Sequence, residues 1–147
     1  LLTELQAREE TQRFLLETVR ELGSPIIPLA EGVIAMPLIG AVDSERAEAI
    51  SRALLRGVAE HRARTVLVDI TGVPLVNAAV ASALIRAMTG VRLLGAEPVL
   101  TGIRADVAQT IVELGLDLTD IVSRSTLQEG LEYALPGYRE GRAQPVS

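Results

Sequence analysis

The sequence predicts an α/β fold: a mixed sheet of four or five strands with about four helices, preceded by a separate linker helix. Two observations carry this prediction. Short apolar runs alternate with longer stretches in which apolar residues recur at three-to-four spacing, the pattern of strands joined by crossover helices. One run, TVLVDI at residues 65–70, is almost wholly apolar and rich in β-branched residues, which is typical of a strand covered on both faces.

Residues 1–23 are expected to form a linker or dimerisation helix. Leucine and valine recur at helical spacing as far as Leu22, and the GSP segment at 23–25 then ends the helix. Arg8 and Gln12 interrupt the apolar stripe, which favours a connector or a dimer seam over a helix of the compact core. The first residues lack both a Met and a signal-peptide pattern, so we expect the chain to be cut from a longer protein on its N-terminal side.

Two apolar runs at 26–29 and 33–39 predict a hairpin at a sheet edge, where Pro28 and Pro37 are tolerated. Asp43 or Ser44 can cap the helix that follows the hairpin, and Asn77 can cap the next helix. The expected elements after the hairpin are a helix of about sixteen residues beginning near Asp43, the strand at 65–70, a helix opening at 75–77, a strand at 98–101, a helix at 104–114 ended by Gly115, a short strand near 121–122, a helix at 126–135 opened by a TLQE capping box, and a flexible tail at 136–147.

Composition excludes several classes of function. Apolar residues make up 48% of the 147 residues, charged residues 22%, and the formal net charge is −5, which is typical of a globular domain. All fourteen basic residues are arginines, scattered without a cluster, and only three residues are aromatic, which argues against binding to nucleic acid. Cysteine is absent, and no apolar run approaches the length of a membrane span. We therefore expect no nucleic-acid or membrane partner, and a cytoplasmic location.

No pattern of catalytic residues stands out. The phosphate-binding glycine motifs, the serine nucleophile elbow and the zinc-protease motif are missing. The single histidine, His61, lies near the end of a predicted helix, where the helix dipole explains it better than catalysis does. Asp43 is expected to cap a helix and Asp69 to bond the backbone of a local turn, so neither is needed as an acid or base. The sequence predicts no catalytic residue, no metal site and no cofactor.

Two positions are candidate modification sites. Asn77 and Ala78 stand at the start of a predicted helix, where free backbone N–H groups receive a phosphate well, although Asn77 is also explained as an N-cap. Thr110 falls on the arc of its helix near Asp106 and Glu113, away from the apolar side formed by Val107, Ile111 and Leu114, and should be accessible.

From about residue 24 to residue 135 the sequence resembles a STAS domain (sulfate transporter and anti-sigma-factor antagonist). The segments that carry the resemblance are SPIIPLAEGVIAMPLIGAVDSERA, VLVDITGVPLVNAAVA, VRLLGAEPVLTGIRADVAQTIVELGLDL and SRSTLQEGLEYAL. The DITGVP and GIRxxxAQT segments are similar to those of the C-terminal output domains of RsbR-type stressosome proteins. The resulting division is a linker at 1–23, a STAS domain at 24–135 and a tail at 136–147.

The resemblance implies a non-catalytic scaffold controlled by phosphorylation. Proteins of the RsbR type assemble with an RsbS-like STAS partner into a large complex that holds an RsbT-like serine/threonine kinase, and this complex regulates a sigma factor in stress responses. It also implies a homodimer joined through the linker helix to an N-terminal sensor.

The phosphorylation sites of the family carry over unequally. The threonine of the AQT segment corresponds to Thr110. The other site, a Thr or Ser after Asp, corresponds to Ala78 after Asn77, so its hydroxyl has been lost. Two other functions stay open at this point, a simple anti-sigma-factor antagonist that acts without a large scaffold and a STAS module that binds a nucleotide or lipid. A small α/β enzyme would need convergent polar groups that the sequence does not show.

Overall fold

A computed structural model describes residues 25–119 and 121–135, and the predicted linker helix and tail lie outside these residues. The described part contains a five-stranded sheet in the order β1-β2-β3-β4-β5. The pairing of β1 with β2 is antiparallel and the other three pairings are parallel. The predicted mixed sheet is confirmed, with these element bounds: β1 Ile27–Ala30, β2 Val33–Ile39, α2 Ser44–His61, β3 Thr65–Gly72, α3 Ala78–Leu93, β4 Glu97–Thr101, α4 Ala105–Glu113, β5 Val122–Ser123 and α5 Leu127–Ala134.

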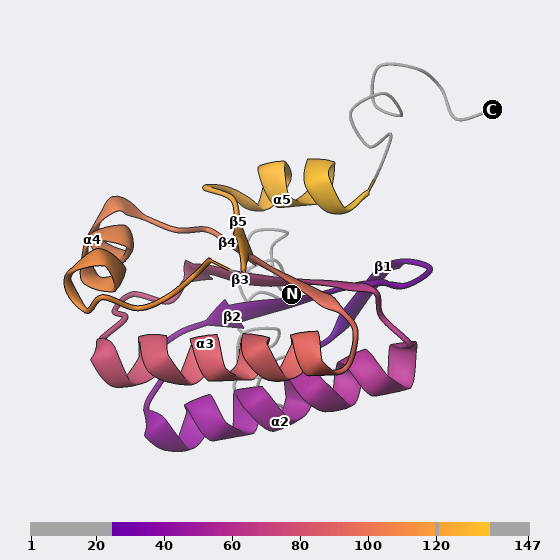
Figure 1. Ribbon diagram of the computed structural model, residues 1–147, viewed down its shortest axis with the longest axis horizontal. Coiled ribbons are helices and arrows are strands. Elements are labelled where there is room, and N and C mark those ends of the chain that lie inside the picture. The colour runs from indigo at the N-terminus through magenta and orange to yellow at the C-terminus, as the bar shows by residue number, and fades with distance from the viewer. Residues whose placement is uncertain (1–24, 120, 136–147) are drawn as a thin grey trace, which may run out of the picture.

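The helices cover the two faces of the sheet unequally. Helices α2 and α3 pack side by side under one face, and α5 lies across the other (Figure 1). Helix α4 lies at the end of the sheet where β3 passes into α3 (Figure 1). This arrangement explains why the run at 65–70 is apolar throughout, since β3 is buried from Val66 to Ile70 between the two helical layers.

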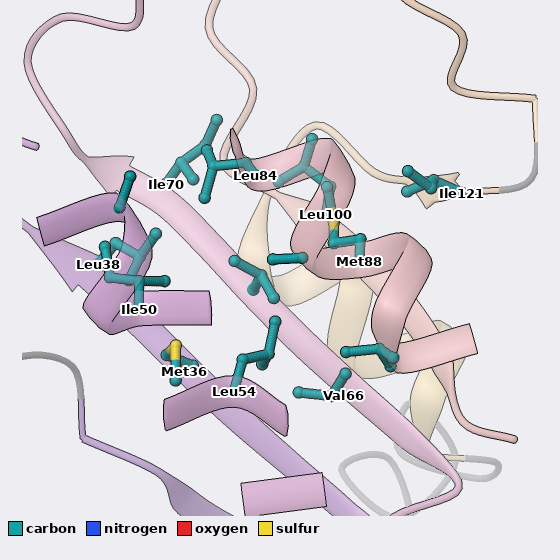
Figure 2. Packing of buried hydrophobic residues seen from close by; sticks show 14 of the residues in the cluster. Met36, Leu38, Ile50, Leu54, Val66, Ile70, Leu84, Met88, Leu100 and Ile121 are labelled. Carbon is teal, nitrogen blue, oxygen red and sulfur yellow. The ribbon is translucent and has the colours of Figure 1, made fainter. Parts of the chain in front are cut away.

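The larger core lies between the sheet and helices α2 and α3. Alternate residues of β2, β3 and β4 point into it, and Figure 2 shows them meeting the buried stripes of the two helices. A smaller apolar cluster on the opposite face is covered by α5. The labelled members of the larger core are Met36, Leu38, Ile50, Leu54, Val66, Ile70, Leu84, Met88, Leu100 and Ile121.

Helix α5 is held to its face of the sheet by close packing and by polar contacts. Gly130 packs so tightly on β4 that an added Cβ would lie 2.4 Å from the Thr101 Cγ2 atom. The Tyr133 hydroxyl donates to Glu97 Oε1 at 2.5 Å, and the Arg124 guanidinium lies 4.7 Å from the centre of the Tyr133 ring. The hydrogen bond to Glu97 raises the pKa of the Tyr133 phenol, whereas the positive charge of Arg124 acts in the opposite direction.

The two prolines of the hairpin occupy different environments. Pro28 lies in the edge strand β1, as predicted. Pro37 does not lie on an edge strand, because β2 pairs with β1 on one side and with β3 on the other. It is tolerated because the β1 pairing extends only to Ala35, so the missing N–H of Pro37 falls beyond the end of that ladder.

Candidate functional site: the ends of β3 and β4 and the helices that follow

The structure gathers the predicted site residues at the carboxyl edge of the parallel strands. Strands β3 and β4 are neighbours in parallel, so the connections into α3 and α4 leave the sheet side by side. The first connection leads to Asn77 and Ala78, and the second leads to the helix that carries Thr110. This edge is where α/β folds generally place their functional groups.

Asn77 is the N-cap of α3, as predicted. Its backbone is extended, with φ −93° and ψ 179°, and its Oδ1 accepts a hydrogen bond from the Val80 N–H at 2.9 Å. Ala78 is the first residue of the helix, and both residues are exposed. The helix begins at Ala78 rather than at 75–77 because the asparagine side chain satisfies a free N–H of the first turn only when Asn77 itself is not helical.

Thr110 lies in the second turn of α4 and is half-buried. Its hydroxyl donates to the backbone carbonyl of Asp106 at 3.1 Å, one turn earlier in the helix. Val107 and Ile111 are buried, as predicted, but Leu114 is exposed and does not join them. The helix ends at Glu113, so Leu114 belongs to the turn that Gly115 continues with φ +64°.

Arg104 ties the two connections together. Its Nη2 donates to the carbonyl of Val73 at 2.7 Å and to that of Pro74 at 3.1 Å, both in the segment that leads to α3. Its Nε lies 3.4 Å from Asp106 Oδ1, in the first turn of α4. The sequence does not predict this bridge, because Arg104 and Val73 are 31 residues apart.

A buried polar cluster lies beneath the same connections. The sequence predicts a backbone partner in a local turn for Asp69, but the structure gives this carboxylate two hydroxyl donors instead. Asp69 Oδ1 accepts from Thr101 Oγ1 at 2.7 Å and from Thr71 Oγ1 at 3.0 Å. The difference arises because β3 continues to Gly72, which places Asp69 inside the sheet beside Thr101 of β4. Asp43 caps α2 by accepting from the Arg46 N–H at 2.7 Å, as predicted.

Gly102 allows the two connections to approach each other. Its φ is +77°, and an added Cβ would lie 2.1 Å from Thr71 Oγ1, 2.6 Å from the Thr71 backbone nitrogen and 2.8 Å from Asp69 Oδ1. No other residue type fits both this backbone conformation and this space. The glycine therefore sets the path of the chain from β4 into α4.

A groove of about 320 Å³ lies on the other side of α4, between this helix and the segment around β5. Its walls are mainly apolar, and Val112 on its rim is 78% exposed. Thr110 does not line this groove. The lining residues are Ile103, Ala108, Ile111, Val112, Leu118, Ser123, Arg124 and Ser125.

Other sites considered from the sequence are placed as follows. His61 is the last residue of α2 and is exposed, in agreement with its interpretation as a residue of the helix C-terminus. Within residues 25–119 and 121–135, no group of three or more His, Asp or Glu side chains is placed to hold a metal ion. In the same part of the chain, no helix has the length and apolar character needed to cross a membrane.

The family model of the STAS domain matches residues 24–130. The chain belongs to the STAS family. The chain is 50% identical, over 117 residues, to the RsbT co-antagonist protein RsbRA of Bacillus subtilis (strain 168), which confirms the resemblance to RsbR-type proteins. The match covers 80% of this chain and 43% of RsbRA, so the chain spans less than half the length of that relative.

Solved structures of STAS proteins agree with this assignment. A substituted form of RsbS from Moorella thermoacetica superposes with a TM-score of 0.67 and 28% identity, covering 79% of this chain and 97% of that protein. A chain from a structure described as the molecular architecture of the stressosome, a signal integration and transduction hub, gives a TM-score of 0.61 and 27% identity, covering 75% and 95%. The STAS fold of the described residues is thus shared along almost the whole length of these proteins.

Proposed function

We propose that this chain is the output STAS domain of an RsbR-type protein and works as a non-catalytic scaffold in a cytoplasmic stressosome-like complex. In this complex it binds an RsbS-like STAS partner and an RsbT-like serine/threonine kinase, and so regulates a sigma-factor stress response. The observation that carries the proposal is the 50% identity to an RsbT co-antagonist over 80% of the chain. The likeness to RsbS and to a stressosome chain supports an assembly built from repeated STAS domains.

The arrangement of the acidic residues supports a scaffold rather than an enzyme. Asp69 is buried and engaged by two hydroxyl groups, and Asp43 is engaged by the first turn of α2. Each carboxylate therefore has a structural partner. What the carboxyl edge of the sheet offers instead is exposed backbone and side chains around Asn77 and Ala78, which suits docking of another protein.

We further propose that Thr110 is the phosphorylation site of this domain. Its hydroxyl lies on a helix at the molecular edge and is engaged only by the Asp106 carbonyl. A phosphate there adds a charge of about −2 close to Asp106 and Glu113, so it changes the surface charge without building a binding pocket. Ala78, at the second position expected from the family, has no hydroxyl, and this chain would therefore switch through a single site.

Replacing Thr110 by alanine is expected to abolish phosphorylation by an RsbT-like kinase. Peptide mass spectrometry after incubation with kinase and ATP should find phosphate at Thr110 in the unmodified chain and none in Thr110→Ala. Thr89→Ala is the matched control, because Thr89 is also a helical threonine whose hydroxyl donates to the carbonyl four residues earlier. Phosphate on Thr71 or Thr101, with Thr110 unmodified, would contradict the assignment.

Mixing the chain with an RsbS-like protein is expected to yield a particle far larger than a dimer. Size-exclusion chromatography with light scattering measures this directly. A mixture that stays at the mass of the separate proteins would contradict the scaffold. If the chain instead binds an anti-sigma factor as a simple pair, the result would favour the antagonist without a large assembly.

A further inference from the structure

Arg104 is the only residue of the described chain for which hydrogen bonds or ion pairs join the segment before α3 to α4. Its guanidinium donates to the Val73 and Pro74 carbonyls through Nη2, and its Nε contacts the Asp106 carboxylate. Arg104 is itself the N-cap of α4, yet its side chain makes no capping bond to that helix. The side chain is therefore committed to the neighbouring connection rather than to the end of its own helix.

The Val73 end of this bridge is rigidly linked to the N-terminus of α3. Val73 is fully buried, and its N–H donates to the Ile70 carbonyl at 3.1 Å. Three residues beyond Pro74, the Asn77 side chain caps α3. Because the segment is short and anchored at both ends, a change in the contacts of the Val73 and Pro74 carbonyls will alter the environment of residues 75–78, of which Val76 is buried and the other three are exposed.

At the α4 end of the bridge, Asp106 contacts both Arg104 and Thr110. The backbone carbonyl of Asp106 accepts the Thr110 hydroxyl at 3.1 Å, while its carboxylate lies 3.4 Å from Arg104 Nε. A phosphorylated Thr110 has no hydroxyl proton to donate, so the bond to Asp106 is lost. The new negative charge lies beside the ion partner of Arg104, and guanidinium groups bind phosphate more strongly than they bind neutral carbonyls.

We infer that Arg104 is a positioning residue that couples Thr110 to the surface before α3, so that negative charge added at Thr110 draws the guanidinium away from the Val73 and Pro74 carbonyls and rearranges residues 75–78. This inference rests on the proposed function for its trigger, the phosphate on Thr110. Through this coupling, a chain with alanine at position 78 would alter that surface by way of Thr110.

The coupling is tested by nuclear magnetic resonance on the full 147-residue chain, labelled with ¹⁵N. Four proteins are compared: the unmodified chain, Thr110→Glu, Arg104→Lys and the double variant. Lysine keeps the positive charge of Arg104 but not the planar guanidinium, whose Nη2 donates to both carbonyls while its Nε contacts Asp106. Val112→Glu is the matched control, since it adds the same charge to α4 on the groove side of the helix.

In the Arg104 background, Thr110→Glu is expected to shift the backbone amide signals of Leu75 to Ala78. In the Arg104→Lys background, Thr110→Glu should leave the signals of these amides at the positions found for Arg104→Lys alone. Val112→Glu should leave them unchanged. Should Arg104→Lys fail to give a dispersed spectrum, Arg104→Gln replaces it in the same comparison.

Two results would overturn the inference. In one, Thr110→Glu perturbs α4 but leaves residues 75–78 unchanged; in the other, it perturbs them equally with and without Arg104. Neither result depends on a kinase, because the charge is introduced by substitution. Failure of the coupling is therefore distinguishable from failure of Thr110 to be phosphorylated, which is measured separately by mass spectrometry.

Discussion

Replacement of Gly102 by alanine is expected to destabilise the domain by at least about 3 kcal/mol. Two costs combine. The residue has φ +77°, which disfavours any side chain, and the new Cβ would lie 2.1 Å from Thr71 Oγ1 and 2.6 Å from the Thr71 backbone nitrogen. The threonine hydroxyl can rotate away, but the backbone nitrogen cannot move without distorting β3. Urea denaturation followed by circular dichroism measures the free energy of unfolding.

Gly95→Ala is the matched control for this prediction. Gly95 has φ +88°, and nothing lies within 4 Å of its added Cβ. This variant carries the conformational cost alone, about 1 kcal/mol. Equal destabilisation of the two variants would show that the contact between the β3 and β4 connections is looser than the structure describes.

The second large effect is expected for Leu54→Ala, which should lower the free energy of unfolding by about 3 kcal/mol. Leu54 is 1% exposed and lies in the core between α2 and the sheet, as Figure 2 shows. Truncation removes apolar contacts on several sides and leaves a cavity that the two packed layers cannot close. Leu93→Ala serves as the control, because Leu93 is 85% exposed and its loss should change the stability by no more than about 0.5 kcal/mol. If Leu54→Ala lowers the free energy of unfolding by less than about 1 kcal/mol, the core repacks around the smaller side chain.

The sequence predicts the layers of this fold well because its apolar pattern is strong. The run at 65–70 indicates a strand covered on both faces, and Asp43, Asn77 and Thr126 each cap the helix that they are expected to cap. The boundaries shift by one to three residues; α3, for example, begins only after Asn77, because the asparagine side chain caps its first turn. At α5 the Glu129 carboxylate accepts from the Ser125 N–H instead of the Thr126 N–H of a capping box.

The local sequence pattern does not predict the polar contacts of the candidate site. Arg104 and Val73 are far apart in sequence, and so are Asp69 and Thr101. They meet only because β3 and β4 pair in parallel at one register, with Asp69 opposite Thr101. The apolar pattern of one short segment does not specify how that segment is aligned with a neighbouring strand. The GIR segment carries part of the resemblance to RsbR-type domains, but only the structure shows which groups Arg104 contacts.

The two edge strands of the sheet affect how readily separate molecules could aggregate. Strand β1 has only four residues, among them the exposed Ile27 and Leu29 and a proline that cannot donate a backbone hydrogen bond. Strand β5, at the opposite edge, has only two residues. Short edge strands, one of which contains a proline, are poor templates for aggregation, in which the edge strands of separate molecules pair with each other. The edges of this sheet therefore protect the domain against aggregation through strand pairing.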